Sequence, residues 1–321
     1  MADSPSTQTI TVTAMRSVVA VCMLAAAQAS AAQVVSPNGG TAITKIVFLG
    51  TGNPAPSPTT MGPSVAIVVR GTPYIVDAGT GVVRRAQEAA EKGVKGLEMK
   101  GLSTVFLTHL HSDHTLGLPD LLFTPWIMHR TNPLQVYGPT GTSAMMSHIM
   151  QAWSADNEIR IKGLERGNSS GVHAIAHEIK PGVVYRDSNV TVSAFLVKHG
   201  SWKQAFGYRF ETPDRTIVIS GDASPSESVV QACNGCDVLI HEAYSQMGYD
   251  QSDSAWRAYT RAFHTSIEEL AALADRAKPK LLILTHQMYF GRPNDTYETM
   301  LAELARRYHG GIASARDLDV F

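Results

Sequence analysis

An apolar run that leads directly into a cluster of histidines constrains this chain more than any other feature. Residues Ser103–Leu107 form the run, and Thr108-His109-Leu110-His111-Ser112-Asp113-His114 follow it. Alternation in an extended segment places the first two histidines on one side, where one metal ion can bind both, and leaves the aspartate and the last histidine for a second ion. A single loop histidine would be interpreted as solvent-exposed, but three with an aspartate in this order predict a metal centre.

Distant segments must supply further ligands to complete such a centre. His199 stands at the end of a predicted strand over residues 191–197, and Asp222 follows Gly221 at the end of another over residues 215–219. A carboxylate in that position can approach two metal ions through its two oxygens, which suits Zn²⁺, Mn²⁺ or Fe. Two alternatives stay open, because a lone strand-end histidine is commonly structural and Asp222 could instead cap the helix that follows.

Length and composition allow a large core and give no strong electrostatic field. The chain has 321 residues, 44% hydrophobic content and a formal net charge of −1, which predicts one large domain or two fused halves. Without a long run of Lys or Arg, the chain offers little general attraction to polyanions. This argues against a nucleic-acid substrate without excluding one.

The N-terminus resembles an export signal. Arg16 precedes the apolar residues 17–27, and Ala29-Ser30-Ala31 offers a cleavage site. We therefore expect a signal peptide over residues 1–32, a linker over 33–43, a hydrolase domain over 44–321, and a periplasmic or secreted protein. The alternative is an N-terminal tail on a cytoplasmic protein.

Two cysteines, Cys233 and Cys236, stand three positions apart after a predicted helix. A local disulfide is one interpretation, which an oxidising compartment would permit. The other is a helix that stops at Asn234-Gly235 between two small apolar side chains. The sequence does not decide between them.

Several motifs together resemble one known family. The His-x-His-x-Asp-His motif after a strand resembles the metallo-β-lactamase superfamily. The turn Gly50–Pro54 and the elements His241-Glu242-Ala243 and His264-Thr265-Ser266 are similar to its ribonuclease Z-like branch, which also holds certain arylsulfatases and cyclic-nucleotide phosphodiesterases. The resemblance covers residues 44 to 321. It implies an α/β fold, the four-layer αβ/βα sandwich, with the ligands at strand ends along one edge.

The resemblance also implies two divalent metal ions, most simply Zn²⁺, with Mn²⁺ or Fe as alternatives. The first ion would bind His109, His111, His199 and Asp222, and the second would bind Asp113, His114, Asp222 and His286. A hydroxide shared by the two ions would be the nucleophile. Asp113 would orient it and accept its proton, while His264, oriented by Glu242, would stabilise the departing oxygen.

Two departures from the branch bear on the substrate. Ribonuclease Z proper grips tRNA with a long basic arm, and residues 155–189 contain no such arm. The family's His-Phe-Ser-x-Arg-Tyr motif becomes His286-Gln287-Met288-Tyr289-Phe290, without the arginine that meets phosphate. We therefore predict a hydrolase of small phosphodiesters or sulfate esters, with tRNA 3′-end processing as the alternative.

A non-catalytic binding protein is disfavoured, because every implied ligand position is filled. The resemblance also suggests a homodimer, for which the chain itself gives no sign.

Overall fold

The computed structural model describes residues 1, 32–37, 42–289 and 295–321. The chain divides into Met1–Ser30 and Ala31–Phe321, and every element below belongs to the second unit. The expected signal peptide lies almost entirely outside the described residues, and so stays a prediction. Among the residues that are described, no helix is long and apolar enough to cross a membrane.

One sheet has six strands in the order β2-β3-β4-β5-β6-β7. The first three strands run antiparallel and the remaining neighbours run parallel. Their bounds are Thr44–Gly50, Ser64–Val69, Thr72–Val76, Thr104–Phe106, Leu134–Gly138 and Ala174–Glu178. The metal motif follows β5 directly, as its position after an apolar run predicted.

The other sheet has eight strands in the order β1-β14-β13-β12-β11-β10-β9-β8. Strands β8 to β11 pair antiparallel, while β11, β12, β13, β14 and β1 pair parallel. Their bounds in chain order are Gln33–Val34, Gly182–Arg186, Thr191–His199, Trp202–Glu211, Thr216–Ile219, Val238–Tyr244, Leu281–Met288 and Gly311–Ser314. The segment expected to be a linker thus contains the short strand β1.

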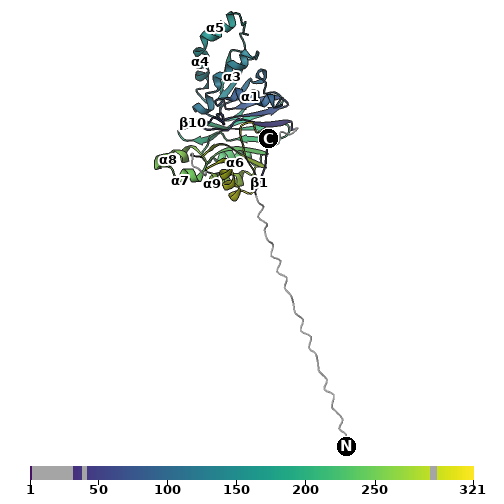
Figure 1. Ribbon diagram of the computed structural model, residues 1–321, viewed down its shortest axis with the longest axis vertical. Coiled ribbons are helices and arrows are strands. Elements are labelled where there is room, and N and C mark those ends of the chain that lie inside the picture. The colour runs from purple at the N-terminus through teal and green to yellow at the C-terminus, as the bar shows by residue number, and fades with distance from the viewer. Residues whose placement is uncertain (2–31, 38–41, 290–294) are drawn as a thin grey trace. The chain divides into compact units, whose positions relative to one another are not determined.

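The two sheets pack face to face, and helices cover both outer faces (Figure 1). On β2, Ile46 and Phe48 belong to the core between the sheets, whereas Val47 and Leu49 pack against helices. This alternation follows from the two-residue period of a strand. Ile217 and Val218 divide the same way on β11. The arrangement confirms the predicted α/β, four-layer sandwich.

Helices on the two outer faces come from different parts of the chain. The side of the six-stranded sheet carries α1 (Val82–Glu91), the short helix η1 (Met99–Gly101), α2 (Ser112–Thr115), α3 (Leu118–Ile127), α4 (Thr142–Ala152) and α5 (Ser154–Lys162). The later part of the chain forms α6 (Glu227–Cys233), α7 (Gln246–Asp250), α8 (Ser254–Phe263), α9 (Ile267–Ala277) and α10 (Tyr297–Arg307). Cys233 and Cys236 form a disulfide where α6 ends.

Candidate metal centre

Two neighbouring histidines and a third that is distant in the sequence bring one ring nitrogen each to the same point. His109 Nε2 lies 2.9 Å from His111 Nδ1, and His199 Nε2 lies 3.2 Å from the same Nδ1 atom. Asp222 joins them, so that four donor atoms lie within 4.8 Å of one another. The structure therefore brings together the residues expected around the first metal ion.

In His109 and His199, the Nδ1 atom has a hydrogen-bond partner, and this leaves the Nε2 atom free to bind a metal ion. His199 donates its Nδ1 proton to the carbonyl of Phe263 at 2.8 Å. His109 Nδ1 lies 3.0 Å from Thr108 Oγ1. Since a neutral imidazole carries one proton, a proton on Nδ1 leaves the Nε2 lone pair for a metal.

His111 differs, because Trp202 donates its indole N–H to Nε2 of this ring at 2.8 Å. An imidazole that binds a metal through Nδ1 carries its remaining proton on Nε2. The Trp202 N–H would then need another acceptor. Sequence reasoning missed Trp202, because a tryptophan at the start of β10 gives no sign of ligand chemistry.

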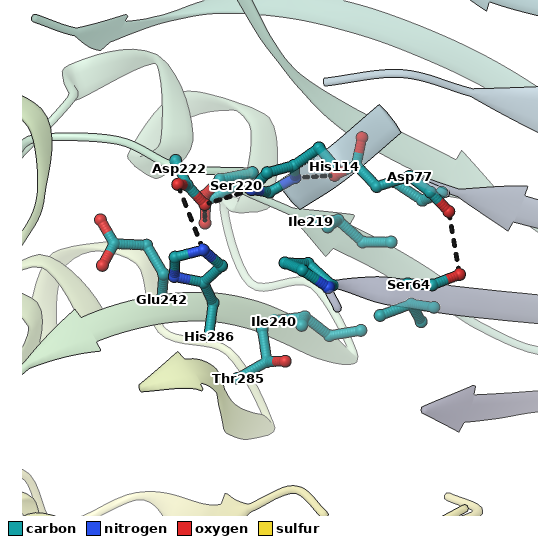
Figure 2. A pocket seen from close by; sticks show the side chains of 14 residues that line it. Ser64, Asp77, His114, Ile219, Ser220, Asp222, Ile240, Glu242, Thr285 and His286 are labelled. Atoms are coloured by element: carbon teal, nitrogen blue, oxygen red, sulfur yellow. Dashed lines mark hydrogen bonds and ion pairs between the residues drawn. The ribbon is translucent and has the colours of Figure 1, made fainter. Parts of the chain in front are cut away.

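A second group of donors lies beside the first. Asp113, His114 and His286 have donor atoms within 4.8 Å of one another. Asp222 Oδ1 is 3.4 Å from His114 Nε2, and Asp222 Oδ2 is 3.4 Å from His286 Nε2. Figure 2 shows Asp222 between these two histidines. Asp222 thus approaches both groups.

One buried atom in this group tests whether the residues fit a metal ion. His114 is 2% exposed, and its Nε2 atom has no hydrogen-bond partner among the described residues. The carboxylates of Asp113 and Asp222 approach it only to 3.5 and 3.4 Å, and a buried polar nitrogen without a hydrogen bond is costly. A cation at the point where His114, Asp113 and Asp222 converge would remove that cost, so the donor set fits a divalent metal.

The backbone at His286 is irregular in a way that aims its side chain. The pairing of β12 with β13 passes from Glu242–Thr285 to Ala243–Gln287, which leaves His286 as an extra residue. Its φ of 43° lies in the left-handed region. Both features are costly for a residue with a Cβ and concentrate at functional sites.

Glu242 and His264 lie next to the two groups. Glu242 Oε1 accepts hydrogen bonds from the backbone N–H of Ala223 and Thr265 at 3.3 and 3.1 Å. His264 Nδ1 is 3.4 Å from the same oxygen, which is ion-pair distance without hydrogen-bond geometry. The His264 ring centre lies 5.4 Å from that of His199. His264 therefore borders the metal centre without belonging to either donor group.

Comparison with known proteins agrees with this geometry. A family model described as "Beta-lactamase superfamily domain" matches residues 72–287. A protein named Ribonuclease Z from Mycobacterium sp. (strain KMS) is 32% identical over 246 residues, which is 76% of this chain and 84% of that protein. The chain belongs to the metallo-β-lactamase superfamily, in its ribonuclease Z-like branch.

Solved structures share the fold of this ribonuclease Z-like protein. The metallo-β-lactamase fold protein YhfI from Bacillus subtilis superposes with a TM-score of 0.66 and 18% identity, covering 87% of this chain and 99% of that one. The short form of human tRNase Z superposes with a TM-score of 0.62 and 24% identity, covering 86% and 98%. Family membership and the His/Asp groups together identify a hydrolase that depends on divalent metal.

Burial and charge set the protonation of the histidines in the two donor groups of this ribonuclease Z-like protein. Burial lowers the pKa of His109 well below its ordinary value and lowers the pKa of His199 to about 4. Burial would also lower the pKa of His114, but the carboxylates of Asp222 and Asp77 raise it well above its ordinary value. The first group thus holds neutral imidazoles, as metal binding requires, and the second holds a positive charge that a metal ion can replace.

Asp77 supports the loop over residues 108–114 of the ribonuclease Z-like protein from behind. It accepts hydrogen bonds from the backbone N–H and hydroxyl of Thr108, and its Oδ2 atom lies 2.8 Å from His114 Nδ1. An aspartate at the end of a strand usually has no such role, and the sequence around Asp77 does not reveal it. The structure shows it directly, with Asp77 at a φ of 60°.

Replacing Asp77 with asparagine is expected to weaken zinc binding by about 10–100-fold, the usual cost of losing a partner behind a ligand histidine. The amide presents N–H groups where Thr108 and His114 now donate. Chelator competition with the purified protein measures the affinity, and Asp156→Asn on the outer helix α5 is the matched control. Equal zinc affinities in the parent protein, in Asp77→Asn and in Asp156→Asn would show that Asp77 does not stabilise the site.

Proposed function

We propose that this protein is a phosphodiesterase of the ribonuclease Z type that acts on RNA. The 32% identity to a protein named Ribonuclease Z, over 76% of this chain, carries the proposal. This result favours the alternative of the sequence analysis over its main prediction of small esters. The proteins compared above include no sulfatase, so we do not carry the sulfate esters further.

The donor groups suggest how the metal ions are held. His109, His111, His199 and Asp222 would hold one ion, and Asp113, His114, His286 and the same Asp222 would hold the other. The mixture of imidazoles and carboxylates is compatible with Zn²⁺ and leaves Mn²⁺ and Fe as alternatives. When bound, two such ions lower the pKa of water and offset negative charge on a phosphodiester.

Residues of the chain itself would move the protons and stabilise the departing oxygen. Asp113, which lies on α2 and belongs to the second donor group, orients the attacking water and accepts its proton on a carboxylate oxygen. His264 faces the oxygen that departs from phosphorus and donates a hydrogen bond or a proton to it. Glu242 Oε1 lies 3.4 Å from His264 Nδ1, so a carboxylate stands beside that imidazole and orients it.

Precursor tRNA with a 3′ trailer provides the direct test. The purified, zinc-loaded protein is expected to release the trailer at one position, as gel electrophoresis of end-labelled RNA shows. A preparation stripped with chelator should be inactive and should recover when zinc returns. Failure to cleave precursor tRNA at full metal occupancy would contradict the proposal.

Hydrolysis of small phosphodiesters is a second candidate, which two observations favour. The net charge is −1, and residues 155–189 form α5, β7 and β8 in place of a long basic arm. The predicted signal peptide would also separate the protein from tRNA. Turnover of bis-p-nitrophenyl phosphate without cleavage of precursor tRNA would establish this candidate instead.

A further inference from the structure

A large cavity lies directly beside His264. Its volume is about 690 Å³, and its walls come from residues 52–58 and Thr60, from α8 and His264, and from Met288, Tyr289 and Tyr297. Asn53 fixes the first of these walls, because its side chain donates to the Gln287 carbonyl at 2.9 Å. A cavity of this size matches those that bind small molecules or parts of larger substrates.

The lining of the cavity is aromatic and carries almost no charge. Trp256, Tyr259, Tyr289 and Tyr297 contribute rings, and none of the described lining residues is Lys, Arg, Asp or Glu. Trp256 and Tyr259 are 59% and 41% exposed, so much of their apolar surface faces solvent. Such a surface favours an uncharged, flat group over a phosphate.

A row of rings connects the cavity to the metal centre. Trp256 and Tyr259 have ring centres 5.5 Å apart, and Tyr259 lies 6.2 Å from His264. His264 in turn lies 6.1 Å from His286. His264 is thus both a wall of the cavity and a neighbour of the metal ligands.

We propose that this cavity binds the aromatic ring system of the departing alcohol, which in an RNA substrate is the base of the nucleotide that leaves. The inference rests on the proposed function, in which His264 faces the departing oxygen. A group attached to that oxygen must extend past His264, and the cavity lies there. Stacking on tyrosine and tryptophan faces would hold a base without reading its sequence.

Binding of two inert probes tests the cavity without turnover. The probes are 2-naphthylmethylphosphonate and methylphosphonate, whose carbon–phosphorus bonds do not hydrolyse. Calorimetry with the zinc-loaded protein should show the naphthyl probe binding at least about tenfold more tightly. Trp256→Ala and Tyr259→Ala should each remove most of that difference. Trp153→Ala, which removes an indole that is 42% exposed outside the cavity, should leave it unchanged.

Rates of ester hydrolysis then distinguish the proposal about the cavity from the proposed function. Methyl 2-naphthyl phosphate and methyl phenyl phosphate release alcohols of similar acidity, so a higher kcat/KM for the naphthyl ester that falls in Trp256→Ala reports the cavity. Equal binding of both probes by the parent protein, or an unchanged difference in the cavity variants, would overturn the inference. Lack of hydrolysis of both esters and of precursor tRNA, with selective binding intact, would contradict only the proposed function.

Discussion

Replacement of Asp222 by alanine is expected to reduce the bound metal to one ion or none and to lower turnover by roughly 10³-fold or more. Losing a partner behind a ligand already costs about 10–100-fold. This change removes a carboxylate that belongs to the first donor group and lies 3.4 Å from both His114 and His286 of the second. It also removes the charge that raises the pKa of His114 and His286. Metal analysis and phosphodiester hydrolysis measure the two effects.

Thermal unfolding supplies an independent measurement of the same loss. A ligand that binds only the folded state stabilises it by RT ln(1 + [L]/Kd). Chelation should therefore lower the Tm of the parent protein and of the control Asp156→Ala, but barely change that of Asp222→Ala. Two ions retained by Asp222→Ala would show that the carboxylate does not bridge them.

Replacement of His264 by alanine should lower turnover by about 10²–10⁴-fold, the usual range for a group that donates a proton, while both metal ions stay bound. His264 lies outside both donor groups, which is why metal content should not change. The loss should be largest for esters whose departing alcohol is weakly acidic, because those alcohols most need a proton. Rates across a series of aryl phosphodiesters would show a steeper dependence on alcohol acidity.

Glu242→Gln provides the companion to this experiment. It keeps the acceptor for Ala223 and Thr265 but removes the negative charge 3.4 Å from His264. If Glu242→Gln loses less turnover than His264→Ala but shows the same dependence on alcohol acidity, both residues act in the step in which the alcohol departs. An equal loss for every departing alcohol, in either variant, would mean that neither acts on the departing oxygen.

Much of this centre could be predicted, because strand alternation and strand ends are visible in sequence. The run from His109 to His114 follows a buried strand, and His199 and Asp222 also stand at strand ends. The placement of His286 could not be derived in this way. It depends on a bulge between β12 and β13 and on a left-handed backbone, and a local pattern does not reveal either one.

Other features escaped prediction because they depend on packing between distant segments. The contact of Trp202 with His111 joins residues far apart in the chain. The aromatic cavity combines residues 52–58 and Thr60 with Trp256, Tyr259 and Tyr297. No periodicity within one segment indicates such a combination, and single aromatic residues usually belong to the core.

Each donor group combines residues from both sheets, so neither half of the chain contains a whole group. His109 to His114 follow β5 of the six-stranded sheet, whereas His199, Asp222 and His286 come from the eight-stranded sheet. A fragment ending before β8 would carry only part of each donor set, and so would its complement. Two such fragments, expressed separately, should each fail to retain zinc tightly, and zinc should favour their reassembly when they are mixed.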